Sequence, residues 1–130
     1  MFQGHFVSED WRQQLLGAVS PFNDGVRKLH VNNFRPSDDE QPRPARTAAV
    51  LVPVLDLDEP EILLTRRAAH LSQHAGQVSF PGGAAEDSDD TAVFTALREA
   101  EEEVGLSPAM VTPLGFLDRF DTVSDYRVLP

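Results

Sequence analysis

Apolar residues recur at a helical period near the start of the chain. The repeat follows positions i, i+4, i+7 and i+8 and consists of Trp11, Leu15, Ala18 and Val19. This spacing predicts an amphipathic helix over residues 9–19 with one buried face. Ser8 can cap the helix, and Pro21 is expected to end it.

A second helical repeat lies further along the chain. Its predicted buried stripe consists of Val93, Leu97, Ala100 and Val104. Residues 88–91 supply polar side chains for the N-cap, and Gly105 followed by Pro108 forms a stop signal. The pattern therefore predicts a helix that ends at about Gly105.

Short apolar runs separated by turn residues predict strands. Residues 47–55 and 61–66 flank a turn and are expected to form a hairpin, and residues 111–120 and 126–129 are expected to form two more strands. Residues 34–46 are rich in proline and acidic residues and read as a linker. The expected organisation is an N-terminal helix and linker over residues 1–46 and one domain over residues 47–130.

The second helix carries four glutamates within five positions. On a helical wheel Glu99, Glu102 and Glu103 share one flank, with Cβ atoms about 5–6 Å apart, whereas Glu101 points to the opposite flank. Three converging carboxylates repel one another, and a hard divalent cation such as Mg²⁺ would reverse that repulsion. The alternative for such a pattern is an acidic face exposed to solvent.

A glycine-rich turn precedes this helix. An apolar run leads into the turn, and the sequence reads Ser79-Phe80-Pro81-Gly82-Gly83. Glycines allow the backbone to approach a ligand closely. The expected order is therefore strand, glycine turn, acidic loop and helix, with the glutamates facing the turn.

This combination resembles the Nudix box of the Nudix hydrolases, G-x5-E-x7-R-E-U-x-E-E-x-G-U, in which U is apolar. The second half fits at every fixed position and reads Arg98-Glu99-Ala100-Glu101-Glu102-Glu103-Val104-Gly105-Leu106. The first half departs from the pattern, because the loop is one residue longer and an aspartate replaces the glutamate. Counting from Gly83 reaches Asp89 and counting back from Arg98 reaches Asp90, so either aspartate is a candidate partner of Arg98.

The preceding segment is similar to the motif L-L-T-x-R-[SA]-x3-R-x3-G-x3-F-P-G-G of the coenzyme A pyrophosphatase subgroup. The matching residues are Leu63-Leu64-Thr65-Arg66-Arg67-Ala68 and Gly76-Gln77-Val78-Ser79-Phe80-Pro81-Gly82-Gly83. The one departure is Ser72, which stands at the position of the second arginine. Together the two motifs cover residues 63–106.

The resemblance implies an α/β fold, a Nudix-type α/β/α sandwich around a mixed sheet. It implies hydrolysis of a pyrophosphate bond in a nucleoside diphosphate derivative, with coenzyme A giving 3′,5′-ADP and 4′-phosphopantetheine. The implied cofactor is Mg²⁺ or Mn²⁺. Runner-up substrates are ADP-ribose, dinucleotides and nucleoside triphosphates.

The resemblance also implies roles for individual residues. The implied catalytic residues are Arg98, Glu99, Glu102 and Glu103. Metal ligands would be Glu99, Glu102 and Glu103, with the Gly82 carbonyl as a further ligand, and substrate contacts would come from Arg67, Gln77 and Gly83. Arg98 would orient the glutamates by bidentate hydrogen bonds, and the alternative for Arg98 is an ordinary surface pair with Glu102. For Arg67 the alternative is a solvated arginine at a strand end.

Composition limits the possible partners. The chain has 130 residues, a net charge of −10 and no cysteine. These values argue against a nucleic-acid partner bound through a basic patch and fit a cytoplasmic protein. The longest apolar stretch, residues 48–55, is far too short to cross a membrane. His70 and His74 have a spacing that can bind zinc, although no third ligand is evident.

Only 24 residues follow Leu106, so the resemblance leads us to expect a Nudix domain that is C-terminally incomplete. An incomplete sheet would expose an edge and favour a homodimer or a strand-swapped assembly. Two other classes of function stay open: a non-catalytic Nudix-like binding domain, and an acidic helical interaction module unrelated to nucleotides.

Overall fold

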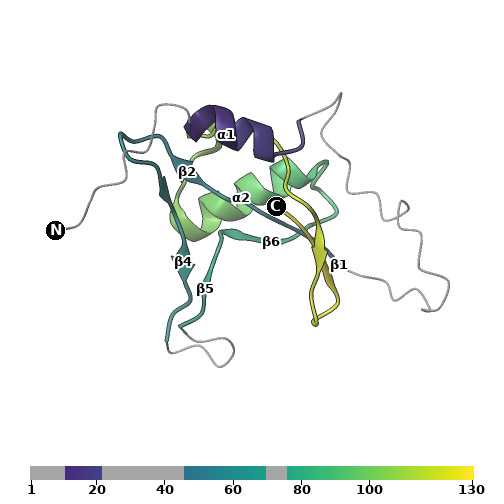
Figure 1. Ribbon diagram of the computed structural model, residues 1–130. Coiled ribbons are helices and arrows are strands. Elements are labelled where there is room, and N and C mark those ends of the chain that lie inside the picture. The colour runs from purple at the N-terminus through teal and green to yellow at the C-terminus, as the bar shows by residue number, and fades with distance from the viewer. Residues whose placement is uncertain (1–10, 22–45, 70–75) are drawn as a thin grey trace.

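The computed structural model describes residues 11–21, 46–69 and 76–130 of the chain (Figure 1). Its centre is a four-stranded sheet with the strand order β6-β1-β8-β7. The strands are β6 (Gly82–Ala84), β1 (Arg46–Val50), β8 (Tyr126–Leu129) and β7 (Phe120–Asp121). Strand β1 is antiparallel to β6 and parallel to β8, so the sheet is mixed. The expectation of an α/β fold with a mixed sheet is therefore confirmed.

Helix α2 (Ala92–Val104) packs on β1 and β6. Thr91 caps its start by accepting a hydrogen bond from the Phe94 amide at 3.1 Å, and Gly105 ends it with a φ of 69°. Both ends agree with the sequence pattern, because a threonine oxygen satisfies a free amide at the N-terminus and glycine accepts the left-handed conformation at the C-terminus.

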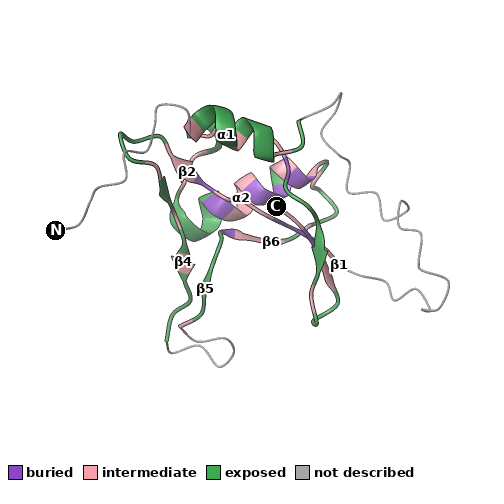
Figure 2. Cartoon of the chain, viewed as in Figure 1, coloured by how far each residue is buried: buried purple, intermediate pink, exposed green. Residues whose placement is uncertain are grey.

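The buried face of α2 differs from the predicted stripe. The fully buried side chains are Ala92, Thr95, Ala96 and Ala100, and they face the sheet (Figure 2). Small residues allow the helix to lie close to a sheet strand that also carries alanines, Ala48 and Ala49. Val93 and Leu97 are only half-buried, and Val104 is 38% exposed. The inclusion of Val104 in the buried stripe was therefore wrong.

Helix α1 (Trp11–Ala18) confirms the first helical repeat in part. Trp11, Leu15 and Val19 are half-buried, whereas Ala18 is exposed and does not belong to the inner face. The helix ends at Ala18, and Ser20 beyond it forms a bridge with Phe116. Residues 9 and 10 of the predicted helix and residues 34–45 of the predicted linker lie outside the described residues, whereas Arg46, the last residue assigned to that linker, begins β1.

The predicted hairpin is present, but its strands are short. Strand β1 ends at Val50, and the chain resumes pairing as β2 (Val54–Leu55) against β3 (Glu61–Ile62). Proline at position 53 has no amide to donate, which limits a continuous ladder there. A second hairpin follows, in which β4 (Thr65–Arg66) pairs with β5 (Val78–Ser79). The strand expected over residues 61–66 is thus divided between two hairpins.

The strand predicted over residues 111–120 was wrong for most of its length. A 3₁₀ helix, η2 (Pro108–Met110), is followed by irregular chain, and only Phe120–Asp121 forms a strand. Pro113 cannot donate to a ladder, and at Gly115 a side chain would approach the Ser20 carbonyl oxygen to 2.5 Å. In this segment Phe116 is buried, whereas Leu114 and Leu117 are 41% and 40% exposed. The strand predicted over 126–129 is confirmed as β8.

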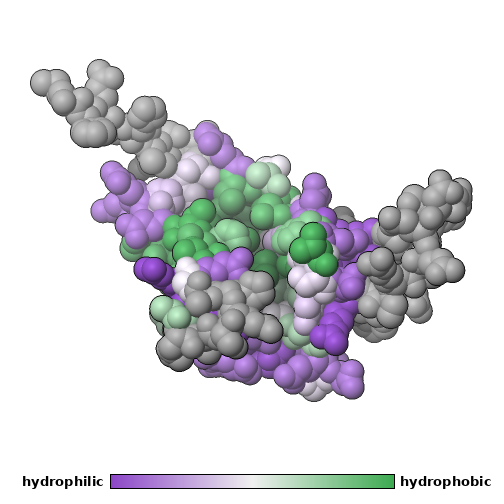
Figure 3. Space-filling model, turned by 90° about the horizontal axis from the view of Figure 1, so that it is seen from below, coloured by the Kyte–Doolittle hydropathy of each residue, from purple (hydrophilic) through white to green (hydrophobic). Residues whose placement is uncertain are grey.

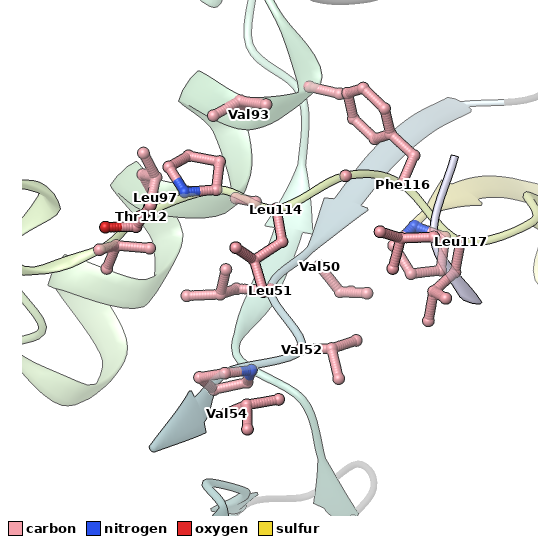
Figure 4. A pocket seen from close by; sticks show the side chains of 18 of the residues that line it. Val50, Leu51, Val52, Val54, Val93, Leu97, Thr112, Leu114, Phe116 and Leu117 are labelled. Carbon is pink, nitrogen blue, oxygen red and sulfur yellow. The ribbon is translucent and has the colours of Figure 1, made fainter. Parts of the chain in front are cut away.

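The apolar residues after η2 line a pocket of about 240 Å³ (Figure 4). Its walls come from α2, the segment after β1 and the segment over 111–117, with Leu51, Val93 and Leu114 among the lining residues. Apolar side chains also surround a hollow on the surface that is seen from below (Figure 3). Within the described residues, no helix has both the length and the apolar character needed to cross a membrane.

Candidate metal and phosphate site

Gly82 and Gly83 belong to strand β6, so the turn predicted at these glycines was wrong, and the chain bends at Pro81 just before them. This segment, residues 81–83, is called the glycine bend below, and it lies against the acidic flank of α2. Gly83 pairs with Ala49 in the sheet, and a β-carbon built on Gly83 would lie 2.5 Å from the carboxyl carbon of Glu99. At Gly82 a β-carbon would instead meet the backbone of β1, 2.5 Å from the Ala49 carbonyl oxygen. The absence of side chains at both glycines therefore brings the sheet edge and the Glu99 carboxylate into direct contact.

Asp89 anchors Arg98, which settles the choice between the two loop aspartates. The Arg98 Nε donates to Asp89 Oδ1 at 3.1 Å, and Nη2 donates to Oδ2 at 2.9 Å. The Asp89 side chain has no exposed surface. The additional residue of the loop therefore lies between Asp89 and Arg98, where eight positions replace the seven of the Nudix pattern.

Electrostatics reinforce this pair. Hydrogen bonding to Arg98, together with donors from Glu86 and Thr95, lowers the pKa of Asp89 to about 2. The same bond raises the pKa of Arg98 above its usual value. Two forked hydrogen bonds between full charges are stronger than neutral ones, so this pair holds the middle of α2 to the loop that precedes the helix.

Arg98 distributes its other donors among several oxygens. Nη1 donates to Glu99 Oε1 at 3.0 Å and to Glu102 Oε1 at 3.4 Å, and Nη2 also donates to the Ala84 carbonyl at 3.2 Å. The bidentate bond expected with the glutamates is therefore made with Asp89 instead. Arg98 still contacts two of the three glutamates, and the surface pair with Glu102 is part of this larger network.

The three glutamates occupy different positions around the bend. Glu99 is 18% exposed in its side chain, and Glu103 accepts a hydrogen bond from the Gly82 amide at 3.4 Å. Glu102 is more open, with 61% of its side chain exposed. Glu101 is exposed and has no contact with the bend among the described interactions. Two of the predicted ligands therefore lie against the glycines, and the third lies beside them in solvent.

The glutamates repel one another at Glu103. Burial raises its pKa, and the charges of Glu99 and Glu102 raise the pKa further, whereas the Gly82 amide and Arg67 lower it. The three carboxylates are thus close enough to interact, and their oxygens are ligands that Mg²⁺ and Mn²⁺ prefer. This chemistry fits a divalent cation. In the described part of the chain, however, no three acidic, histidine or cysteine side chains already converge at coordination distance.

The predicted substrate residues lie on the second hairpin and the bend. Arg67 donates its backbone amide to the Gln77 carbonyl at 2.9 Å, which extends the β4–β5 pairing and places the two residues opposite each other. The charge of Arg67 reaches Glu103. Arg67 is therefore near the acidic cluster, and Gln77 is exposed beside it. Ser72, His70 and His74 lie outside the described residues.

Sequence reasoning missed one residue of this network. Thr95 is fully buried, and its hydroxyl lies 2.9 Å from Asp89 Oδ2. A polar residue on the small apolar face of the helix was the available signal. The role of the Gly82 carbonyl stays a prediction, because the described contact of Gly82 is made through its amide.

The fold and the Arg98–glutamate cluster correspond to a known class. The family model for the NUDIX domain matches residues 45–129, and the chain therefore belongs to the Nudix family. It is 48% identical over 111 residues to proteins of Shigella flexneri serotype 5b (strain 8401) and Escherichia coli (strain K12), both named "Uncharacterized Nudix hydrolase NudL". Each alignment covers 80% of this chain and 58% of the relative, so the chain spans somewhat more than half the length of these relatives.

Solved structures give a weaker likeness. A NUDIX hydrolase from Alicyclobacillus acidocaldarius is 28% identical, with a TM-score of 0.49 over 65% of this chain and 68% of that protein. The Nudix hydrolase RenU from M. smegmatis is 20% identical, with a TM-score of 0.45 over 65% of this chain and 53% of that protein. The family model and the curated relatives carry the family assignment.

Proposed function

We propose that the protein hydrolyses the pyrophosphate bond of a nucleoside diphosphate derivative with the help of a divalent cation, Mg²⁺ or Mn²⁺. The observation that carries this proposal is the contact of Glu99 and Glu103 with the glycine bend. Glu102 lies beside them, and Arg98 donates a hydrogen bond to Glu99. The Nudix family membership supports it, because metal-dependent chemistry is general in that family.

The carboxylates Glu99, Glu102 and Glu103 would hold the cation, with the Gly82 carbonyl as a further ligand. When bound, the cation neutralises phosphate charge and lowers the pKa of a coordinated water. The cluster is acidic and the whole chain carries a charge of −10, so the cation also bridges two negatively charged partners. Arg98 keeps Glu99 in position, and Gly83, which has no side chain, leaves room for the Glu99 carboxylate against strand β6.

Arg67 and Gln77 would contact the substrate from the second hairpin. The charge of Arg67 lowers the pKa of Glu103, which supports a position for this positive group near the acidic cluster. A guanidinium in that position suits a phosphate oxygen. In the reaction a water oxygen bonds to one phosphorus, the bridging P–O bond breaks, and the product phosphates share the released proton with solvent.

Coenzyme A is the substrate we propose, with 3′,5′-ADP and 4′-phosphopantetheine as products. The match of residues 63–83 to the coenzyme A pyrophosphatase motif supports this choice, and Ser72 is its departure. Other Nudix substrates and a non-catalytic binding role are the competing proposals.

The experiment is a panel assay on this chain with coenzyme A, ADP-ribose, NADH and nucleoside triphosphates, each with and without Mg²⁺. The proposal predicts that 3′,5′-ADP forms from coenzyme A at the highest rate and only with the metal. Faster turnover of another diphosphate would replace the proposed substrate. Metal-dependent binding without turnover of any member would favour the binding domain.

We also propose a cytoplasmic homodimer or strand-swapped assembly, with neither a nucleic acid nor a membrane as a partner. The absence of cysteine supports the cytoplasmic location, and the strongly acidic composition supports the absence of a nucleic-acid partner. The open apolar pocket beside α2 supports association, because exposed apolar surface of this kind favours pairing between chains.

A further inference from the structure

Thr95 stands out because, among the described residues, it is the polar residue that is buried as a whole, and its hydroxyl contacts the enclosed side chain of Asp89. It lies on the face of α2 that is otherwise made of alanines. We propose that Thr95 is a positioning residue, which fixes Asp89 and through it Arg98 and Glu99. This inference rests on the proposed metal-dependent function of the glutamate cluster. It assigns to Thr95 the role of keeping Glu99 in position through Asp89 and Arg98.

The Thr95 hydroxyl has two acceptors within reach, Asp89 Oδ2 at 2.9 Å and the Thr91 carbonyl at 3.3 Å. A hydroxyl carries a single proton and can donate to only one of them at a time. The carboxylate is charged and closer, so the bond to Asp89 is the stronger one. The buried Thr95 hydroxyl therefore donates its hydrogen bond to Asp89.

Asp89 is held from four directions. Its Oδ2 receives the Thr95 hydroxyl, the Glu86 amide at 2.9 Å and Arg98 Nη2 at 2.9 Å, while Oδ1 receives Arg98 Nε at 3.1 Å. These donors define the plane of the carboxylate. Because Arg98 meets that plane with two parallel bonds, the plane also sets the direction of the guanidinium.

The direction of the guanidinium reaches the acidic cluster. Once Nε and Nη2 are fixed on Asp89, the remaining nitrogen Nη1 has only one place, and there it donates to Glu99 Oε1 at 3.0 Å. Glu99 is the carboxylate that lies against Gly83. The order Thr95, Asp89, Arg98, Glu99 therefore connects a buried hydroxyl in the sheet-facing side of α2 to a proposed metal ligand.

The loop before α2, which carries Asp89, explains why a hydrogen bond from Thr95 is needed. Aspartate is one methylene shorter than the glutamate of the Nudix pattern, and the loop is one residue longer. A shorter side chain on a longer loop needs an additional constraint to meet Arg98 in a fixed orientation. The Thr95 hydroxyl, placed one turn before Arg98, supplies that constraint.

The test compares Thr95→Val, which removes the hydroxyl at constant shape, with Thr95→Ser, which keeps it. The first readout is the Arg98 Nε–H signal in ¹⁵N-resolved NMR spectra of the metal-free protein, including its exchange rate with water. The second is the affinity for Mn²⁺ alone, from electron paramagnetic resonance of the free ion. Thr91→Ala is the matched control, because it removes the N-cap of the same helix without touching Asp89.

We expect Thr95→Val to accelerate exchange of the Arg98 Nε–H at least tenfold and to weaken Mn²⁺ binding about fivefold. Thr95→Ser and Thr91→Ala should leave both values within about twofold of the unchanged protein. If Thr95→Val does not fold, Thr95→Ala gives the same comparison without a methyl group against the carboxylate.

A folded Thr95→Val or Thr95→Ala protein with an unchanged Arg98 signal and unchanged Mn²⁺ affinity would overturn the positioning role. A Thr91→Ala protein that lost both signals to the same extent would also overturn it, since general weakening of the helix would then explain the effect. Absence of Mn²⁺ binding by the unchanged protein would instead overturn the proposed function.

Discussion

At the scale of single residues, Asp89 anchors Arg98 and the network around it. Its carboxylate is enclosed, and its pKa falls from 3.8 to about 2 because Arg98 donates two hydrogen bonds to it. A carboxyl whose folded pKa lies below its unfolded value stabilises the fold at pH values above the unfolded pKa. For a change of this size the contribution is about 2 kcal/mol, and it is lost as the pH falls from about 4 towards 2.

We therefore predict that Asp89→Asn lowers the free energy of unfolding by about 2 kcal/mol at pH 7, because Arg98 then faces a neutral partner. Urea unfolding at pH 7 and at pH 2.5 provides the measurement. The difference between the two proteins should shrink at the lower pH. Asp90→Asn is the control, and an equal loss in both variants would contradict the assignment of the anchor to Asp89.

Much of the site at this scale was predictable. The 3.6-residue period alone separated Glu99, Glu102 and Glu103 from Glu101, since the side-chain directions on a helix follow from sequence spacing. The choice between two adjacent aspartates was not predictable, because it depends on how a loop with one additional residue folds back. Thr95 was missed for a similar reason, since its partner lies six positions away across the helix start.

At the scale of elements, the two glycines of strand β6 have different tasks. A β-carbon at Gly82 would meet backbone atoms of β1, namely the Ala49 carbonyl oxygen at 2.5 Å and the Val50 Cα at 2.6 Å. At Gly83 the three atoms nearest to a β-carbon would be those of the Glu99 carboxyl group. Backbone cannot move away cheaply, whereas a flexible side chain can.

We predict that Gly82→Ala lowers the free energy of unfolding by about 1–3 kcal/mol through overpacking, while Gly83→Ala lowers it by less than about 1 kcal/mol. Gly83→Ala should nevertheless weaken Mn²⁺ binding and turnover by about tenfold, because it displaces Glu99. Thermal or urea unfolding and a Mn²⁺ titration of both variants separate the two effects. If Gly82→Ala and Gly83→Ala had equal stabilities and equal Mn²⁺ affinities, the two glycines would not have the different roles that we propose.

Element existence was easier to predict than element extent. Helix α2 has caps and a strong period: its end at Gly105 was predicted, and its N-cap, Thr91, is one of the four residues, 88–91, that were expected to supply the cap. The strand expected over residues 111–120 failed, because Pro113 and Gly115 interrupt a run whose apolar residues could equally line a pocket. The same ambiguity of short apolar runs explains why the stretch 47–55 was predicted as one strand although Pro53 divides it.

At the scale of the whole molecule, an apolar pocket of about 240 Å³ opens beside α2. The chain spans 58% of the length of the relatives it matches. Within the described residues, Met110 lines the pocket and is 79% exposed, and Val123 is fully exposed away from it. The two residues therefore form a matched pair for testing association.

We predict concentration-dependent self-association in sedimentation velocity experiments. A charge in the pocket should oppose burial of that surface, so Met110→Glu is expected to weaken association about tenfold, whereas Val123→Glu should change it by less than about twofold. Sedimentation of a monomer at all concentrations would contradict the proposed assembly, and equal effects of the two variants would place the contact elsewhere.

The most direct test of the central claim is Mg²⁺-dependent hydrolysis of coenzyme A by the unchanged protein, Glu102→Gln and Glu101→Gln. The two glutamates are adjacent, both are exposed, and only Glu102 lies on the flank beside the bend. If the acidic flank holds the cation, Glu102→Gln should lose hydrolysis by about a hundredfold or more while its circular dichroism spectrum is unchanged, and Glu101→Gln should stay within about twofold. Equal turnover by Glu102→Gln and the unchanged protein would contradict the claim.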